Sequence, residues 1–253
     1  MSGKKSKLTW AMILVNVLVF ELIFSMPESM LEQAFEILSF SSANFLEVWR
    51  WLTSMFVHAS PSHLFFNMIA LYFFGRVLED ELSTGQWLGI YFISGIAGNI
   101  VYGLTSTAPA VGASGCIFGM LGAAMLLKPK EPIRIYLLPL PLGLIAVLYI
   151  LTQAALAAVP TDVVGIAYMA HIGGLVAGSA MLFFFEPKEA FKGILWMALC
   201  LVLLLVLAPL IGLVVFIGQI ILGVFDLIVG TVLILAAKLL FSWIWVIIQG
   251  FLV

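Results

Sequence analysis

The chain has 253 residues, of which 64% are apolar and 9% charged, and its mean hydropathy is +1.21. This composition excludes a soluble globular domain and indicates a protein that crosses a lipid bilayer several times. The net charge of −2 gives no sign of nucleic-acid binding, and the two cysteines, Cys116 and Cys200, lie in apolar segments with neither disulfide nor metal-ligand spacing.

Apolar segments of roughly the 20 residues that cross a bilayer follow one another along the chain. We predict transmembrane helices near residues 10–26, 62–79, 86–105, 114–128, 133–157 and 166–186. The first segment follows three lysines, as a signal peptide would, but it has no small-residue cleavage site and many spans follow. We therefore expect a retained helix and an all-α polytopic membrane protein with a six-helix bundle.

We expect three parts: a cytoplasmic N-terminal tail at 1–9, a core at 10–186 and a hydrophobic C-terminal extension at 187–253. The extension is long enough for one or two further transmembrane helices, with a break near 217–219. Pro209 could kink the first of them. Asp226 has no role that we can assign beyond packing or pairing.

The basic residues are distributed asymmetrically about the predicted helices. With a cytoplasmic N-terminus, one side collects Arg76, Lys128, Lys130, Arg134, Lys188 and Lys192. Arg50 alone falls outside, which fits the positive-inside rule. This orientation, in what we expect to be the plasma membrane, puts the starts of the helices at 114 and 166 near the outer face.

The segment 27–61 mixes apolar and acidic residues and is too long for a simple connector. Such a mixture suits short helices in the membrane interface. Trp49 and Trp51 suit the level of the lipid headgroups.

Polar residues open the helix at 62–79. His63 and Asn67 are four apart and share one helical face. Polar side chains in a membrane segment are costly and usually face the bundle interior. Two hydrogen-bond donors there could stabilise developing negative charge, although a bond between helices would explain the pair about as well.

Ser114 lies in the run Gly112-Ala113-Ser114-Gly115 at the start of the helix predicted at 114–128. A serine is a weak nucleophile and needs a base within hydrogen-bond reach. His171 is the only histidine in the second half of the chain and the only candidate there.

Glycine spacing predicts how these two residues meet. Gly115 and Gly119 repeat as Gly-x-x-x-Gly, and so do Gly174 and Gly178. Small faces let two helix backbones approach closely, and His171 lies on roughly the face of its glycines. The packed pair would bring it to the start of the helix at 114, where unpaired backbone N–H groups can hold an anion.

A simpler interpretation makes the serine a packing residue and the histidine a bundle histidine. This interpretation must explain His63, Asn67, Ser114 and His171 separately, whereas one acyl-transfer site explains all four together. No carboxylate is well placed as a third member, because Asp162 lies in the loop before the sixth predicted helix, 166–186, and Glu186 at the inner end of that helix. We therefore expect a serine–histidine dyad.

The residues resemble the rhomboid intramembrane serine proteases over about residues 10–186. The motifs that carry the resemblance are Trp49-Arg50, His58 with His63-x-x-x-Asn67, Gly75-x-x-x-Glu79, Gly112-Ala113-Ser114-Gly115, and Ala170-His171-x-x-Gly174-x-x-x-Gly178. Each motif is weak alone, but together they stand in the family's order on the expected helices.

The resemblance implies a role for each matched residue. Ser114 would be the nucleophile and His171 the general base, while His63, Asn67 and the Ser114 backbone N–H would stabilise the oxyanion. His58 would support the site, as would Gly112, Gly115, Gly174 and Gly178. Phe118 takes a position where family members often have a tyrosine that packs on the histidine.

The resemblance also implies the partners. Substrates would be transmembrane helices of other membrane proteins, cleaved in the lipid bilayer near the outer face. The helix at 133–157 and the loop at 158–165 are candidate moving parts. No metal, nucleotide or other cofactor is implied.

Two alternatives stay open. A catalytically inactive rhomboid-like protein would bind membrane clients with the same fold. A transporter or channel would need ionisable groups along a crossing path, whereas the polar groups here gather near one face.

Overall fold

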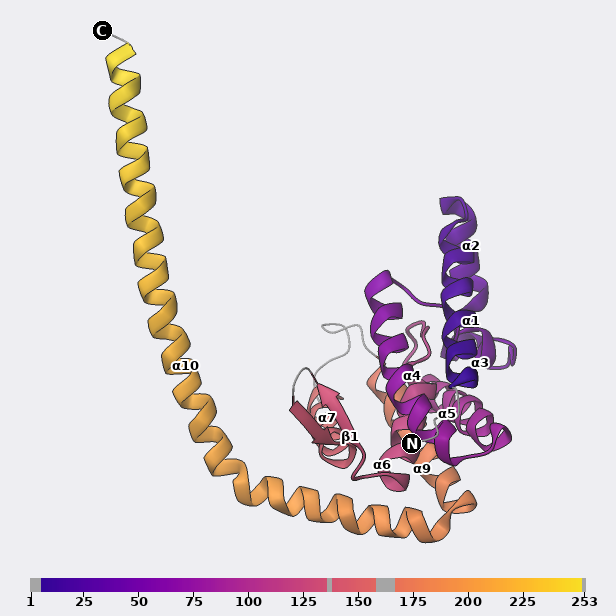
Figure 1. Ribbon diagram of the computed structural model, residues 1–253. Helices are drawn as coiled ribbons and strands as arrows, with labels where there is room; N and C mark the ends of the chain where they lie inside the picture. Colours follow the sequence, from indigo (N-terminus) through magenta and orange to yellow (C-terminus); the bar gives the residue numbers. More distant parts are fainter. Residues whose placement is uncertain (1–5, 136–137, 158–166, 252–253) are drawn as a thin grey trace. The chain divides into compact units, whose positions relative to one another are not determined.

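The computed structural model describes residues 6–135, 138–157 and 167–251. Helices dominate, so the all-α polytopic fold class is confirmed. The chain divides into two compact units, Met1–Leu201 and Val202–Val253. Every helix and strand before α10 belongs to the first unit (Figure 1).

The elements of the first unit are, in chain order, α1 (Lys7–Phe24), α2 (Glu28–Leu38), the 3₁₀ helix η1 (Ser42–Asn44), α3 (Arg50–Thr53), α4 (Pro61–Glu81), α5 (Thr84–Thr105), α6 (Ser114–Leu127), β1 (Pro132–Ile135), β2 (Leu138–Pro141), α7 (Leu142–Ala157) and α9 (Tyr168–Phe185). The last helix, α10 (Pro187–Phe251), begins in the first unit and continues through the second.

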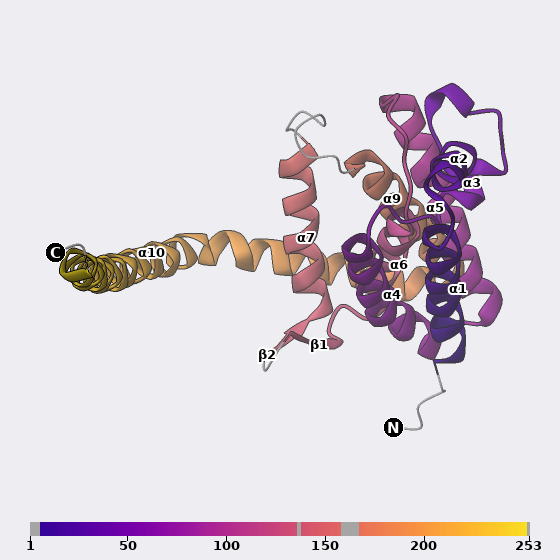
Figure 2. The ribbon, with the colours of Figure 1, turned by 90° about the horizontal axis from the view of Figure 1, so that it is seen from above.

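The innermost helix of the first unit is α6. Every residue from Gly115 to Leu127 is buried, and α4, α5 and α9 pack around the helix, with α7 at the edge (Figure 2). Its 14 residues are only about 21 Å long at ~1.5 Å per residue, less than the ~30 Å hydrocarbon core. A helix with protein around it need not match that thickness, because its neighbours shield it from lipid.

Several helices are long and apolar enough to cross a membrane. Among the described residues these are Lys7–Phe24, Thr84–Thr105, Tyr168–Phe185 and Pro187–Leu210. The chain is therefore a multi-pass integral membrane protein. The segment of α10 in the second unit exposes most of its described large apolar side chains, such as Leu205 and Val206, as a helix in lipid would.

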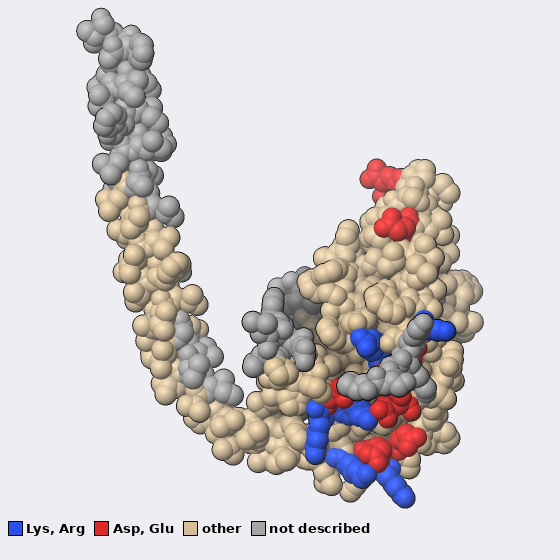
Figure 3. Space-filling view, viewed as in Figure 1, with Lys and Arg blue, Asp and Glu red and all other residues tan. Residues whose placement is uncertain are grey.

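Charged side chains gather at one end of the first unit (Figure 3). There the Glu79 carboxylate of α4 accepts hydrogen bonds from the backbone N–H groups of Leu8 and Thr9, at 2.8 and 2.9 Å, and from the Thr9 hydroxyl at 2.6 Å. Glu79 thereby caps the start of α1 from another helix. Nearby, the Lys128 ammonium lies 2.7 Å from the Glu81 carboxylate.

A β-hairpin precedes α7, where the sequence predicts a helix from residue 133. The strands β1 and β2 pair antiparallel, with Ile133 opposite Leu140. Pro139 and Pro141 have no backbone N–H, and inside a helix their rings would clash with the preceding turn. The helix therefore begins at Leu142, directly after the second proline.

The predicted break at 217–219 is wrong, because α10 is helical throughout this stretch. Gly218 costs a helix only about 1 kcal/mol relative to alanine and Gln219 less, too little to stop an apolar helix. Pro209 also lies inside α10. The side chain of Asp226 lies outside the described residues, as do Asp162 and the loop at 158–165.

Candidate active site

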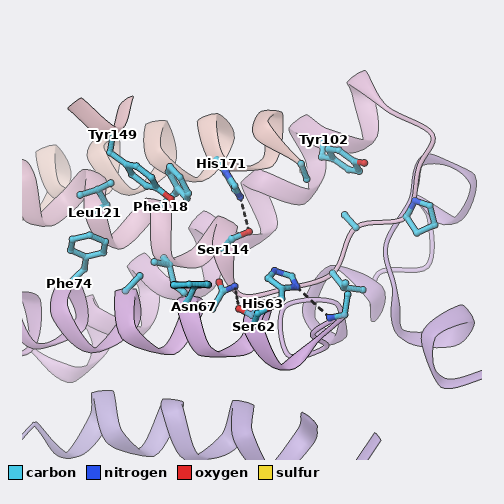
Figure 4. A pocket seen from close by; sticks show the side chains of 18 residues that line it. Ser62, His63, Asn67, Phe74, Tyr102, Ser114, Phe118, Leu121, Tyr149 and His171 are labelled. Atoms are coloured by element: carbon cyan, nitrogen blue, oxygen red, sulfur yellow. Dashed lines mark hydrogen bonds between the residues drawn. The ribbon is translucent and has the colours of Figure 1, made fainter. Parts of the chain in front are cut away.

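Ser114 and His171 meet at the end of the first unit that lies away from the charged cluster. Ser114 is the first residue of α6 and His171 lies one turn into α9. The Ser114 Oγ and His171 Nε2 atoms are 2.9 Å apart (Figure 4). His171 is only 7% exposed. This is the distance at which an imidazole can take a proton from a hydroxyl.

The glycines of α6 and α9 hold the two helices in backbone contact. A Cβ atom added at Gly174 would lie 2.1 Å from the Gly115 carbonyl oxygen, and one at Gly178 would lie 2.0 Å from that of Gly119. No side chain fits at either place. The contact fixes His171 over the start of α6.

Aromatic rings stack beside the histidine. The rings of Phe118 and His171 have centroids 4.1 Å apart and planes 9° from parallel. Tyr149 of α7 stacks on Phe118, with centroids 5.1 Å apart. The stack holds the imidazole parallel to the Phe118 ring and so limits its rotation about the Cβ–Cγ bond.

The other ring nitrogen of His171 also has a partner. Its Nδ1 atom lies 2.9 Å from Oε1 of Gln153 in α7, and Gln153 is only 8% exposed. Gln153 belongs to none of the sequence motifs. An amide in an otherwise apolar membrane helix was the available signal, because polar groups there usually face a partner.

His63 and Asn67 of α4 line the same cavity as Ser114 and His171. The His63 Nδ1 atom accepts a hydrogen bond of 3.4 Å from the Ala59 backbone N–H, so the neutral ring carries its proton on Nε2 and can donate from there. Asn67 Nδ2 donates to the His63 carbonyl oxygen at 2.8 Å. An amide nitrogen has two hydrogens, so Asn67 can serve a second acceptor.

Gly112 has the conformation that its position in the motif requires. Its φ is +118°, a region that residues with a side chain rarely adopt. A Cβ atom there would also lie 2.7 Å from Cε1 of His63. Glycine therefore lets the His63 ring approach the chain just before Ser114.

His58 supports the same stretch of chain. Its Nε2 atom accepts a hydrogen bond of 3.5 Å from the Ala113 backbone N–H, and its Nδ1 atom lies 3.3 Å from the Phe56 carbonyl oxygen. Burial, with a further contribution from nearby His63, lowers the pKa of His58 to about 4. The ring is therefore neutral at pH 7, as an accepting Nε2 requires.

Ser54 and Asn99, which belong to none of the sequence motifs, hold the loop before Ser114. The Ser54 carbonyl accepts a hydrogen bond of 2.8 Å from the Gly112 N–H. Asn99 of α5 donates to the Ser54 hydroxyl at 2.9 Å and to the Trp51 carbonyl at 3.0 Å. The segment around α3 thus fixes the position of the loop before Ser114.

Arg50 of the Trp49-Arg50 pair ties this segment to α2. Its guanidinium lies 2.6 Å from the Glu47 carboxylate and donates to the carbonyl oxygens of Ser39, at 3.1 Å, and Glu36. Cations commonly stabilise the carbonyl end of a helix in this way. Arg50 therefore orders the first loop.

The cavity beside Ser114 has a volume of about 600 Å³, within the range of about 300–1,000 Å³ of ligand sites. Its walls are mostly apolar and come from α4, α5, α6, α7, α9 and the loop before α6; they include Phe66, Phe74, Val111 and Leu121. Cys116 points elsewhere: it is fully buried against Gly95 of α5.

Residues 46–188, more than half of the chain, match the Rhomboid domain. The chain belongs to the rhomboid family. This rhomboid is 35% identical to Rhomboid protease GluP of Bacillus subtilis (strain 168) over 132 residues, which are 52% of the chain and 25% of that protein.

Two further relatives carry the name Rhomboid protease GlpG. The protein of Yersinia pestis (strain Pestoides F) is 29% identical over 153 residues, 60% of this chain and 53% of the relative. That of Serratia proteamaculans (strain 568) is 32% identical over 144 residues, 56% and 50% respectively. The chain thus spans about half the length of these relatives and a quarter of the first.

Proposed function

We propose that this rhomboid is an intramembrane serine endopeptidase that uses Ser114 and His171. The observation that carries the proposal is the 2.9 Å approach of Ser114 Oγ to His171 Nε2 in a cavity of about 600 Å³. The names of the relatives, all rhomboid proteases, support it.

In the proposed reaction, His171 Nε2 takes the proton as Ser114 Oγ attacks the scissile carbonyl carbon. The imidazolium then gives this proton to the leaving amine, which departs with one part of the substrate. Water then attacks the acyl-enzyme while His171 Nε2 takes its proton. That proton passes to Ser114 Oγ as the second product leaves. The two steps return both residues to their starting states.

The carbonyl oxygen becomes negative when the serine attacks, and three donors are available to stabilise it. His63 can donate from Nε2, Asn67 from its amide, and Ser114 from a backbone N–H that has no partner within the helix because it is in the first turn. Losing one such donor typically costs about 10²–10³ in kcat.

We propose transmembrane helices as substrates. A helix shields its peptide bonds, so it must unwind locally, which small or helix-breaking residues make easier. The N-terminus would be cytoplasmic and the membrane the plasma membrane, which puts cleavage near the outer face.

The test is cleavage of a transmembrane reporter substrate in liposomes by the wild type, Ser114→Ala and His171→Ala. We expect cleavage by the wild type alone. Equal cleavage by all three would refute the proposal. A wild type that neither cleaves nor reacts with a fluorophosphonate would favour the client-binding alternative, and solute flux that survives both substitutions would favour a transporter.

A further inference from the structure

We propose that Gln153 is a positioning residue that holds His171 in the tautomer able to act as a base. The inference rests on the proposed protease function and adds a third residue to the serine–histidine pair. Gln153 acts through His171 and does not touch the reacting atoms.

The tautomer decides whether His171 can work. A neutral imidazole carries one proton, and the nitrogen without it is the acceptor. Nε2 must be that acceptor to take a proton from Ser114, so Nδ1 must carry the hydrogen and donate it. The Gln153 Oε1 atom, 2.9 Å from Nδ1, is an acceptor for this hydrogen.

The setting of Gln153 favours a lasting contact. Its side chain is nearly fully buried, and the described part of α7 around it is apolar except for Thr152 and Tyr149. A buried amide without a partner would be costly. Because an amide is neutral, it orients the ring without stabilising the imidazolium as a carboxylate does, so its effect should be smaller than that of an aspartate in a triad.

The contact also links α7 to the histidine. Gln153 and Tyr149 are four residues apart and share one face of α7. Gln153 bonds the ring of His171 directly, while Tyr149 reaches it through Phe118. His171 is therefore fully oriented only when α7 is seated against α6 and α9.

An amide can present either its oxygen or its NH₂ group, and the two favour opposite tautomers of His171. A carboxylate can only accept and a thioether accepts weakly. Gln153→Glu keeps the acceptor at the same reach, whereas Gln153→Met keeps the length and removes it. The pair separates the hydrogen bond from the packing of the side chain.

The experiment compares the wild type, both Gln153 variants, Ser114→Ala and the control Thr152→Val in liposomes. Thr152 is exposed, and among the described residues its hydroxyl bonds the Leu148 carbonyl of its own helix. The measurements are kcat and KM on the transmembrane reporter, the rate of fluorophosphonate labelling, and the melting temperature. The labelling rate reports the reactivity of Ser114 without a need to unwind a substrate.

We expect Gln153→Met to lower kcat and the labelling rate about 10-fold, as the loss of a buried hydrogen bond would, with KM unchanged. The melting temperature should fall in this variant because the Nδ1 hydrogen of His171 loses its buried acceptor, so both rates are compared per folded enzyme. Gln153→Glu should restore most of both rates, and Thr152→Val should match the wild type. A Gln153→Met protein with wild-type kcat would overturn the inference, as would equal losses in the Met and Glu variants. A wild type that behaves like Ser114→Ala would instead refute the proposed protease function itself.

Discussion

Phe118 lies flat against His171, with ring centroids 4.1 Å apart and planes 9° from parallel. Aromatic stacking of this kind contributes about 0.5–1.5 kcal/mol. Because the ring face makes the contact, a leucine would hold the imidazole less firmly in its orientation. We expect Phe118→Leu to lower kcat/KM by up to about 10-fold in the liposome assay. A 10-fold loss corresponds to the upper end of that range of energy.

Phe118→Tyr is the matched control for this prediction. It keeps the aromatic ring that stacks on His171 and adds only a hydroxyl, so activity should stay within about twofold of the wild type. If the leucine variant were as active as the tyrosine variant, the stack would have no role in orienting His171.

The close contact of α6 and α9 at their glycines, which we call the glycine seam, predicts that a single added methyl group lowers the stability of the protein. A Cβ at Gly178 would lie 2.0 Å from the Gly119 carbonyl oxygen, and a backbone atom cannot turn aside as a side chain can. We expect Gly178→Ala to lower the free energy of unfolding in mixed micelles by about 1–3 kcal/mol.

Gly85 of α5 is the control, because a Cβ there would meet nothing within 4 Å. Alanine is the better helix former by up to ~1 kcal/mol, so Gly85→Ala should be neutral or stabilising. Equal effects at the two glycines would show that the helices can separate without cost.

Glu79 and Glu81 offer a matched pair of carboxylates on α4. Glu79 caps α1 with three hydrogen bonds, whereas Glu81 only pairs with half-exposed Lys128. We expect Glu79→Ala to cost about 1–2 kcal/mol of stability, as a lost helix cap does.

Glu81→Ala should cost no more than about 1 kcal/mol, because an exposed ion pair contributes little. Denaturation of the two variants in the same micelles makes the comparison. A larger loss at Glu81 than at Glu79 would contradict it.

The low pKa of His58 predicts a dependence of stability on pH. Its folded value is about 4, against 6.5 for the free side chain, so between these values the unfolded chain binds a proton that the folded chain does not. Stability therefore falls as the pH drops from about 6.5 towards 4. We expect the melting temperature to drop more between pH 7.5 and pH 5 in the wild type than in His58→Gln.

The comparison with His58→Gln cancels the contributions of the carboxylates and of the other histidines, which both proteins share. Glutamine keeps an acceptor for the Ala113 N–H but does not titrate. An identical drop in the two proteins would mean that His58 is protonated in the folded state as easily as in the unfolded one.

Hydropathy and glycine spacing predict much of this molecule. The five helices α1, α4, α5, α6 and α9 lie within three residues of their predicted bounds, because polar residues separate the apolar runs. The two Gly-x-x-x-Gly motifs predict a close α6–α9 pair, and the structure brings the backbones into contact there. The roles of the site residues stay predictions.

Other features depend on contacts between residues far apart in the sequence, which no local sequence pattern reveals. Gln153 lies 18 residues before His171, and nothing in their spacing says that the two side chains meet. The start of α7 was misplaced because hydropathy does not distinguish a proline-rich apolar strand from a helix. The continuity of α10 was missed for the opposite reason, since Gly218 and Gln219 break a pattern without breaking a helix.

The glycine seam also separates two properties of the protein. Main chain touches main chain between α6 and α9, so that contact has no side chains through which the geometry of Ser114 and His171 can be adjusted. The cavity wall, in contrast, consists of side chains such as Phe66, Val111 and Leu121. Substitutions in the wall can therefore change which peptides fit while the spacing of the pair stays constant, so selectivity and intrinsic reactivity can evolve independently.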